Sequence, residues 1–416
     1  MTQNVSLIPF FKSYHLPLKD QPVVAAVSGG PDSMALLDLL VEAGARVIAA
    51  HVDHQLRADS ADESRLLKAY CAARQVKLVE TSWPKDLHPA TGIEAAARDF
   101  RYAFLVKTAK EAGANYILTA HHGDDLAENE LIKFIRSGKP QEMNSLQRSG
   151  QIHGVKLLRP LLDFSKAELL AYDQQRGLSY ILDQTNTEDD TLRNRLRHHV
   201  MPQLKRESPQ LIAHAGEFSR EMTALTAWAI RGMQQIVPES YLDSLRVKSL
   251  NLSPTAEFLY WQYQIKTCFN EQIGHFGRWR LVHKAGYDYL IPPAVTEARK
   301  KIEPNQPFAF AGRHFCLRTS RIENEDTAWQ LLGTFQADGS DFAAGVLPAG
   351  LKLNLKNGQH AKAKKKFADH GVPGPMRSHA LAIFCANQAV FVEKCYQNQV
   401  FSENSPSYWL YYEKNI

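Results

Sequence analysis

Several features that mark whole classes of protein are missing from this chain. Its 416 residues hold no apolar run long enough to span a bilayer, and no basic segment followed by an apolar core opens it. We therefore expect neither a membrane anchor nor a signal peptide. The five cysteines are odd in number and scattered, without a C-x-x-C, which argues against a disulfide framework, a zinc ribbon and a redox pair. A reducing cytoplasm fits these absences best.

Two familiar phosphate-binding signatures are also absent. No Gly-Lys-Ser/Thr follows a glycine-rich turn, which excludes a Walker A loop, and no G-x-G-x-x-G dinucleotide fingerprint occurs. In their place stands Ser28-Gly29-Gly30-Pro31-Asp32-Ser33, between an apolar run at 23–27 that predicts a buried strand and a run at 34–43 that predicts a helix. Such a turn presents N–H groups beside the positive end of the helix dipole and is suited to phosphate.

The residue types of this turn sharpen the prediction. Gly29 and Gly30 let the backbone approach a ligand closely, and the hydroxyls of Ser28 and Ser33 add donors. Asp32 would be repelled by bare phosphate, which suggests a bridging Mg²⁺ or a substrate contact. A serine and glycine turn that only caps a helix is the alternative interpretation of the motif.

The first half of the chain alternates strand and helix signals. Further strands are expected at 47–52, 77–80 and 116–120, with helices at 59–76, 93–112 and 124–135. This order predicts an α/β fold, a parallel sheet with helices on both faces. The alternation stops near residue 203. We expect a nucleotide-binding catalytic domain at 1–205, a mostly helical connector and middle substrate domain at 206–335 and a small α+β domain at 336–416, with a linker at 336–345.

Two polar clusters follow predicted strands. They are His51-Val52-Asp53-His54 and His121-His122-Gly123-Asp124-Asp125. Ligands of open parallel sheets bind beyond the carboxyl ends of the strands, so both clusters should converge with the 28–33 turn. Their histidines and aspartates could also suggest a metal site, but typical zinc spacing is missing, and Mg²⁺ carried in with a nucleotide is favoured.

Charged pairs on predicted helices offer further candidates. Asp125 and Glu128, three apart, could clamp a substrate ammonium or relay its proton, or could simply satisfy the helix dipole. Arg98 and Arg101 could grip phosphate, or could belong to a solvated face. The basic segment 193–199 could be a surface helix or an RNA contact.

A lysine cluster dominates the tail. No acidic residue occurs from 342 to 368, whereas six lysines do: Lys352, Lys356, Lys362, Lys364, Lys365 and Lys366. A solvated face is the ordinary interpretation of such a block. A contact with a nucleic-acid backbone is the sharper one, since lysines that neutralise phosphates release counterions.

Taken together, these motifs resemble the tRNA(Ile)-lysidine synthase family of PP-loop ATP pyrophosphatases. The resemblance is strong over about half the chain and looser in the tail. It is carried by the 28–33 turn and by 51–57, 92–98, 101–102, 120–128, 159–162, 183–186 and 193–197, and in the tail by 364–367 and 372–377.

The resemblance implies a two-step ligation on RNA. ATP would activate the O2 oxygen of the wobble cytidine of an isoleucine tRNA with a CAU anticodon, releasing pyrophosphate. The ε-amine of free L-lysine would then attack carbon 2 and release AMP. A protonated amine cannot attack, so a carboxylate must position it and accept its proton.

The resemblance also implies roles for individual residues. ATP would be held by Ser28, Gly29, Gly30, Pro31, Asp32 and Ser33, with Mg²⁺ on Asp32. Lysine would be held by Asp125 and Glu128, while His121 and Arg195 would serve the reacting phosphate and base. Support would come from His51, Asp53, Arg98 and Arg101, and tRNA would contact Lys362, Lys364, Lys365, Lys366 and Arg377.

The chain departs from the family pattern at a few positions. Leu126 and Asn129 stand where the family usually has Gln and Thr, 139–143 replaces a glycine-rich stretch, and Ala380 replaces a proline. A PP-loop tRNA thiolase is the alternative enzyme, and a non-catalytic RNA-binding protein is the alternative of another class. The sequence leaves the oligomeric state open, a homodimer included.

Overall fold

The computed structural model describes the chain except residues 1–4, 15, 17–19, 56–59, 183–188, 272, 274, 323–327, 356–358, 399–404 and 415–416. Contacts divide it into two compact units, Met1–Trp228 and Ala229–Ile416. The boundary falls within one long helix, α10 (Leu211–Gln235). Within the described residues, no helix combines the length and the apolar character needed to cross a bilayer.

The first unit is built on one sheet with the strand order β3-β2-β1-β4-β6-β5. All neighbouring strands pair in parallel except β5, which runs antiparallel to β6 at the edge. This confirms the α/β fold expected from the sequence. The strands are β1 (Val23–Ala26), β2 (Val47–Asp53), β3 (Lys77–Ser82), β4 (Tyr116–Leu118), β5 (Ser149–Ile152) and β6 (Val155–Leu158).

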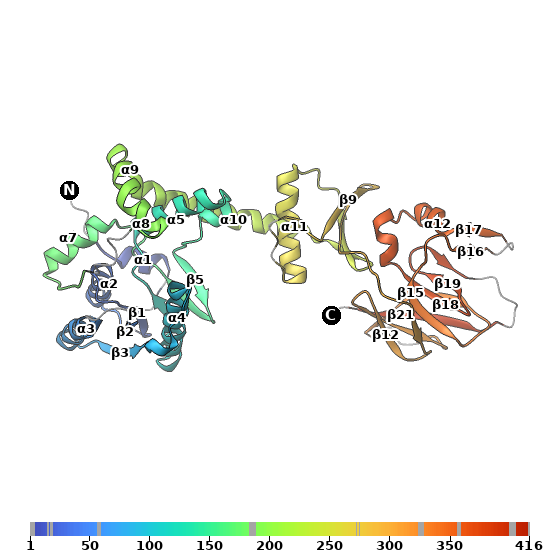
Figure 1. The fold of residues 1–416 in the computed structure, drawn as a ribbon, viewed down its shortest axis with the longest axis horizontal. Coiled ribbons are helices and arrows are strands. Elements are labelled where there is room, and N and C mark those ends of the chain that lie inside the picture. The colour runs from blue at the N-terminus through green and yellow to red at the C-terminus, as the bar shows by residue number, and fades with distance from the viewer. Residues whose placement is uncertain are drawn as a thin grey trace. The chain divides into compact units, whose positions relative to one another are not determined.

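Helices connect these strands and cover the sheet (Figure 1). The helix predictions at 59–76, 93–112 and 124–135 correspond to α3, α4 and α5. The helices are α1 (Ile8–Ser13), α2 (Pro31–Glu42), α3 (Ser60–Arg74), η1 (Lys85–Leu87), α4 (Ile93–Glu111), α5 (Gly123–Arg136), α6 (Pro140–Met143), α7 (Lys166–Arg176), α8 (Leu192–Arg195), η3 (Leu196–Val200) and α9 (Met201–Glu207).

The two faces of the sheet carry separate hydrophobic clusters. Val23 and Ala25 of β1 pack with Leu36 and Leu40 of α2 on one face, whereas Val24 packs with α4 on the other. Consecutive strand residues point to opposite faces, so a strand buried on both faces must be apolar throughout. This is why the run at 23–27 has no polar residue.

The connections leave an opening at the carboxyl ends of β1 and β4. From β1 the chain crosses to β2 on one side, and from β3 it returns to place β4 on the other side of β1. The segments that follow β1 and β4 therefore diverge, which creates the crevice where doubly wound sheets bind ligands. The turn at 28–33 and the cluster at 121–125 flank this point.

The second unit consists mainly of antiparallel sheets, with strand orders β7-β8-β10-β9, β11-β15-β18-β19-β20, β12-β13-β21-β14 and β16-β17. Its elements are β7 (Glu239–Tyr241), β8 (Ser244–Lys248), α11 (Pro254–Phe269), β9 (Arg280–Lys284), β10 (Tyr287–Ile291), β11 (Lys300–Ile302), β12 (Pro307–Phe310), β13 (Arg313–Arg318), β14 (Trp329–Gln336), β15 (Phe342–Val346), β16 (Lys352–Asn354), β17 (His360–Lys362), α12 (Ala363–Asp369), η4 (Gly374–His379), β18 (Leu381–Cys385), β19 (Gln388–Val392), β20 (Tyr396–Gln397) and β21 (Ser407–Glu413).

The segment 336–345 is not a linker, and that prediction is wrong. It ends β14 and begins β15, and Ala337 is fully buried. Phe315, before the segment, and Leu381, after it, belong to one hydrophobic cluster with Phe342. Small residues here serve close packing, since a Cβ added to Gly339 would lie 2.9 Å from Cys385 Sγ. The segment 206–335, expected to be mostly helical, contains α10 and α11 and also the strands β7–β14. The predicted boundaries at 205 and 335, between a catalytic domain, a middle substrate domain and a C-terminal domain, remain predictions about function.

Candidate active site

The turn at 28–33 forms a compact loop between β1 and α2. Gly29 has φ +78°, a backbone conformation that favours glycine, and its carbonyl oxygen accepts a 2.9 Å hydrogen bond from the Ile181 N–H. The Ser33 hydroxyl donates to the Gly30 carbonyl at 2.8 Å and accepts from the Ser28 N–H at 3.1 Å. Pro31 opens α2, where a missing N–H costs nothing. The loop is thus pre-formed at a helix N-terminus.

A cavity of about 530 Å³ opens beside this loop. Eight of the residues singled out from the sequence line it: Ser28, Gly30, Asp32, Ser33, Asp53, Arg101, His121 and Asp125. Glu63, His54 and Tyr102 line it as well. The three polar segments that the sequence placed at one sheet edge therefore do converge there.

Asp32 is paired with Lys166, the first residue of α7. The Lys166 Nζ lies 2.6 Å and 2.7 Å from the two carboxylate oxygens of Asp32. The backbone N–H of Lys166 donates to Asp124 Oδ2 at 2.7 Å. A capping box of Ser165 and Glu168 fixes this helix end. An ammonium group thus stands at the loop, where the anionic ligand would sit.

Asp125 and Glu128 share a partner, Arg197 of η3. Its guanidinium forms two bonds to Glu128, of 2.7 and 2.8 Å, and one of 2.9 Å to Asp125 Oδ1. The Glu128 side chain is only 2% exposed, and Glu128 is not among the residues that line the cavity, whereas Asp125 is. Burial acts to raise the pKa of Asp125, but His122, whose backbone N–H also donates to the carboxylate, and the Arg197 guanidinium outweigh it and hold that pKa below its usual range. Asp125 is therefore the ionised carboxylate that faces the cavity.

The histidines of the site have distinct positions. His51 is buried, and its Nδ1 contacts the Val27 carbonyl at 3.0 Å, so it braces the start of the loop and does not line the cavity. His121 lines the cavity, with its Nδ1 2.9 Å from the Thr119 hydroxyl. Burial lowers the pKa of His121 to about 4, Asp125 opposing and nearby arginines assisting. It is therefore neutral near pH 7.

Not every arginine that the sequence singled out reaches this cavity. Arg101 lines it, but Arg98 lies over the Tyr102 ring and lines a second cavity, of about 560 Å³, with Arg159. Arg195 is exposed, and it donates to the backbone carbonyls of Asp189 and Asp190 at 2.9 and 3.2 Å. Arg195 does not line the cavity, and its role at the reacting phosphate and base remains a prediction. The segment 183–186 lies outside the described residues.

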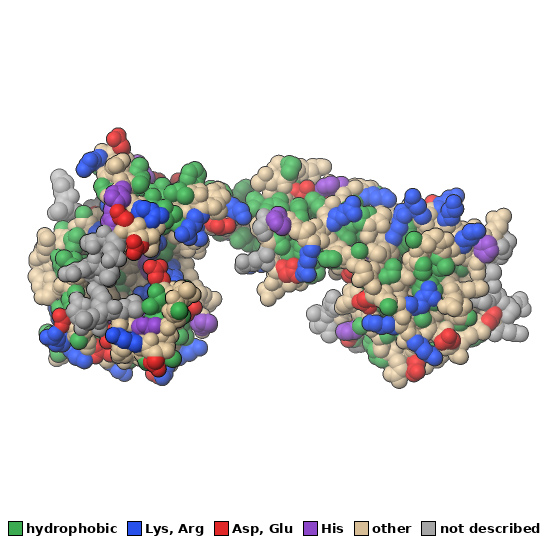
Figure 2. Space-filling model, in the orientation of Figure 1, with side chains coloured by type: hydrophobic (Ala, Val, Ile, Leu, Met, Phe, Trp, Pro, Cys, Tyr) green, Lys and Arg blue, Asp and Glu red, His purple; other side chains and the backbone are tan. Residues whose placement is uncertain are grey.

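The lysines of the tail lie on β17 and α12 in the second unit. Lys362, Lys364 and Lys365 are exposed and Lys366 is half-buried. Basic side chains gather over α12 in Figure 2. Arg377 lies over the ring of Phe367 at 5.9 Å. Together these five residues form a basic surface, which we call the α12 basic patch (Lys362, Lys364, Lys365, Lys366 and Arg377).

Two residues of the site were missing from the sequence-based assignments, Lys166 and Arg197. Each meets its partner across a long stretch of chain, 134 residues for Lys166 and Asp32 and 72 for Arg197 and Asp125. Arg197 stood in a basic segment that we had noted without a role for it. For Lys166, the capping box marks only a helix start.

The departures from the family pattern have local explanations. Leu126 is fully buried and packs in the core, and the Asn129 amide donates to the Ser145 hydroxyl at 3.0 Å. The 139–143 segment forms the short helix α6. Ala380 is fully buried beside β18.

Comparison with known proteins agrees with this geometry. A family model described as a PP-loop domain matches residues 4–204. The tRNA(Ile)-lysidine synthase of Lactobacillus gasseri is 41% identical over 428 residues, which cover 97% of this chain and 98% of that protein. That of Lactobacillus johnsonii is 40% identical with the same coverage, and that of Bacillus subtilis is 37% identical over 52% of this chain and 48% of that protein.

Fold, loop and family model together define the first unit as a PP-loop domain of the ATP-binding class. Because relatives of this identity cover nearly the whole chain, the family can be given more narrowly. The chain belongs to the tRNA(Ile)-lysidine synthase family.

Proposed function

We propose that this protein is a ligase that joins free L-lysine to carbon 2 of the wobble cytidine of an isoleucine tRNA with a CAU anticodon. The reaction consumes ATP, passes through an adenylylated cytidine, and yields lysidine, AMP and pyrophosphate. Family membership over nearly the whole chain is the observation that carries this proposal. The cavity beside the loop supports it, because it combines anion-binding and amine-binding groups within one space.

The loop at 28–33 serves the phosphates of ATP. Its N–H groups and hydroxyls surround the N-terminus of α2, where an anion is favoured. Lys166, now on Asp32, can turn to the phosphates when ATP enters, because its long side chain starts from a fixed helix end. Arg101 adds a second cation to the cavity.

Asp32 is the residue that fits a magnesium ion. A carboxylate with neighbouring hydroxyl oxygens is the oxygen-rich donor set that Mg²⁺ prefers. When bound, Mg²⁺ would neutralise phosphate charge and assist the departure of pyrophosphate. Asp32 keeps Lys166 in place until then.

Asp125 is the carboxylate that we assign to the lysine amine. It lines the cavity and is ionised near neutral pH, so it can hold the substrate ammonium and take a proton from it. Glu128 acts through Arg197, whose fork it fixes, and Arg197 in turn holds one oxygen of Asp125. The pair predicted from the sequence is thus divided into a residue that contacts substrate and a residue that positions it.

Neutral His121 suits the developing charge at the reacting oxygen. A neutral imidazole accepts or donates a hydrogen bond without adding a charge that would compete with the phosphates. We assign it to the cytidine or the α-phosphate. We assign the α12 basic patch to the tRNA backbone.

The thiolase alternative lacks a suitable cysteine. Cys71 is the only cysteine before Cys268 in the sequence. It is 3% exposed in the hydrophobic core, and burial raises the pKa of its thiol to about 11. Such a thiol is inert at neutral pH and cannot carry a persulfide to the cavity.

The test is incorporation of labelled lysine into RNA. The protein is incubated with ATP, radiolabelled lysine and bulk bacterial tRNA, and the RNA is digested to nucleosides. We expect label in one modified cytidine of an isoleucine tRNA, dependent on ATP. Absence of label from RNA, with pyrophosphate still released, would point to a different acceptor and contradict the proposal.

A further inference from the structure

Three side chains with metal-ligating atoms meet in the second unit, far along the chain from the PP-loop. They are Glu257 of α11, His283 of β9 and Asp288 of β10. One ligand atom from each lies within 4.8 Å of the others, and no other such group of three occurs within the described residues. Neither the sequence motifs nor the proposed reaction accounts for them.

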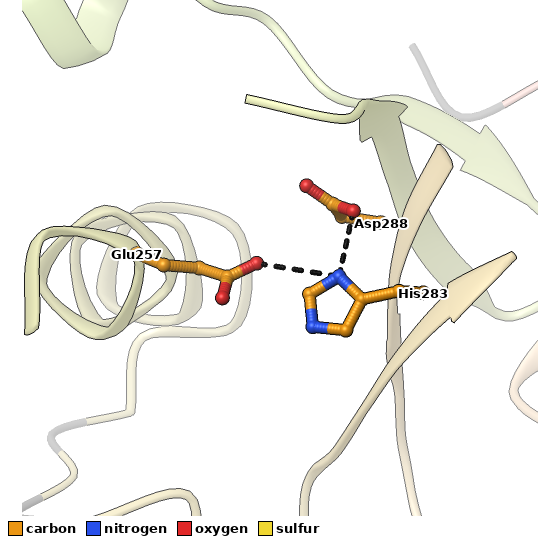
Figure 3. A group of neighbouring side chains, drawn as sticks. All are labelled: Glu257, His283 and Asp288. Carbon is orange, nitrogen blue, oxygen red and sulfur yellow. Dashed lines mark hydrogen bonds and ion pairs between the residues drawn. The ribbon is translucent and has the colours of Figure 1, made fainter. Parts of the chain in front are cut away.

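The ligand atoms converge on one point. Both carboxylates face the same imidazole nitrogen, as Figure 3 shows. His283 Nδ1 lies 2.8 Å from Asp288 Oδ1 and 3.7 Å from Glu257 Oε1. Two ligands of a tetrahedral zinc ion, each at about 2.0–2.1 Å, stand roughly 3.3 Å apart. The two distances bracket that value, so small side-chain rotations would admit an ion.

The charge of the two carboxylates and the hydrogen bond that orients Asp288 also favour a bound cation. A single imidazole nitrogen can donate to only one of the two carboxylates at a time. The Asp288 side chain is only 2% exposed, and its second oxygen accepts a 3.1 Å hydrogen bond from the Leu250 N–H. A ligand held from behind in this way is oriented before any ion arrives. The His283 side chain is 60% exposed, which gives a solvent path.

We propose that Glu257, His283 and Asp288 bind one divalent transition-metal ion, and that Zn²⁺ is the ion they bind best. One nitrogen and two carboxylate oxygens suit zinc, and a water would complete the tetrahedron. The ion would tie α11 to the β9–β10 hairpin. Bound to both elements, it would stabilise them against unfolding, and this inference does not depend on the proposed function.

The experiment measures zinc stoichiometry on the full, untagged chain after chelator treatment. After equilibrium dialysis at micromolar free Zn²⁺, elemental analysis measures the zinc bound to a reference protein and to its His283→Ala and Glu257→Gln variants. His314→Ala is the matched control, because His314 has the same side-chain exposure and one carboxylate partner, Glu413, at 3.0 Å. Every protein in the series, the reference protein included, carries His198→Ala and His199→Ala, because these two histidines both contact Asp189 and could also bind zinc.

We expect the reference protein and its His314→Ala variant to bind one equivalent of zinc more than the His283→Ala variant. The Glu257→Gln variant should bind zinc at least tenfold more weakly than the reference protein. Zn²⁺ should raise the unfolding temperature of the reference protein but not of His283→Ala. Bound Co²⁺ should give the intense visible bands of a tetrahedral site. Equal zinc content with and without His283, or no thermal shift specific to it, would show that the three side chains form an ion pair only and would overturn the proposal.

Discussion

The cavity beside the PP-loop and the α12 basic patch hold charge in two different ways. In the cavity, Asp32 and Asp125 are each engaged by a cation from a distant segment, and these two carboxylate side chains are only 26% and 15% exposed. In the patch, the lysines are mostly exposed and, among the described residues, none forms an ion pair. Catalysis on a nucleobase needs side chains held in a fixed geometry, whereas attraction to a phosphate backbone needs only their positive charge.

The largest expected effect follows from breaking the fixed geometry at the loop. Asp32→Ala should lower pyrophosphate release by roughly 10³-fold, because it removes the carboxylate proposed for Mg²⁺ and frees Lys166. Circular dichroism should show an unchanged fold. Asp62→Ala, an exposed acid of α3 paired with Arg65, is the control and should keep full activity. Pyrophosphate release at the wild-type rate by Asp32→Ala would contradict the assignment of the 28–33 loop to ATP.

Asp125 should affect the second step more than the first. In Asp125→Asn we expect lysine incorporation to fall by roughly 10²-fold and transfer of AMP to tRNA to change little, because only the amine loses its carboxylate. Arg197 keeps its two bonds to Glu128, so the fold should persist. Glu111→Gln, at an exposed position of α4, is the control. An equal fall in AMP transfer and in lysine incorporation would contradict the assignment of Asp125 to the lysine amine.

A buried acid beneath the loop should make the first unit sensitive to pH. Asp173 is fully buried, and neither carboxylate oxygen has a hydrogen-bond partner among the described residues. Burial, and then the charge of Asp32, raise the pKa of Asp173 to about 7. The folded chain therefore holds a proton that the unfolded chain releases, and stability falls as pH rises from about 4 to about 7.

Asp173→Asn should remove this effect. We expect a stability gain on the order of 2–4 kcal/mol at about pH 8 and almost none at about pH 4. Chemical denaturation at the two pH values measures it, with Asp99→Asn on the exposed face of α4 as the control. A gain of the same size at both pH values would mean that Asp173 is already ionised or already neutral throughout.

The smallest effect belongs to the patch. Replacing Lys362, Lys364 and Lys365 by alanine should raise the KM for tRNA several-fold and leave ATP affinity unchanged. The salt dependence of tRNA binding should become shallower by roughly one unit of log–log slope per lost phosphate contact. Replacing the exposed Lys107, Lys110 and Lys156 of the first unit is the matched control. An unchanged slope would identify the patch as a solvated surface.

The same contrast explains what the sequence could predict. The parallel sheet and the phosphate loop follow from local signals, since the apolar run at 23–27 and the glycines at 29–30 act through neighbouring residues. The pairing of Lys166 with Asp32 and of Arg197 with Asp125 leaves no periodic trace, because it joins segments far apart in the chain. The edge strand β5, Ser149–Ile152, was missed because its residues are mostly polar and exposed.

The proposed reaction requires that the cytidine be activated in the cavity at the PP-loop before lysine attacks. The most direct measurement uses ATP labelled at its α-phosphate with an isoleucine tRNA and no lysine. We predict that the label becomes attached to the tRNA as pyrophosphate is released, and that it leaves as AMP when lysine is added. Label that appears on lysine, or that joins tRNA only when lysine is present, would contradict the account.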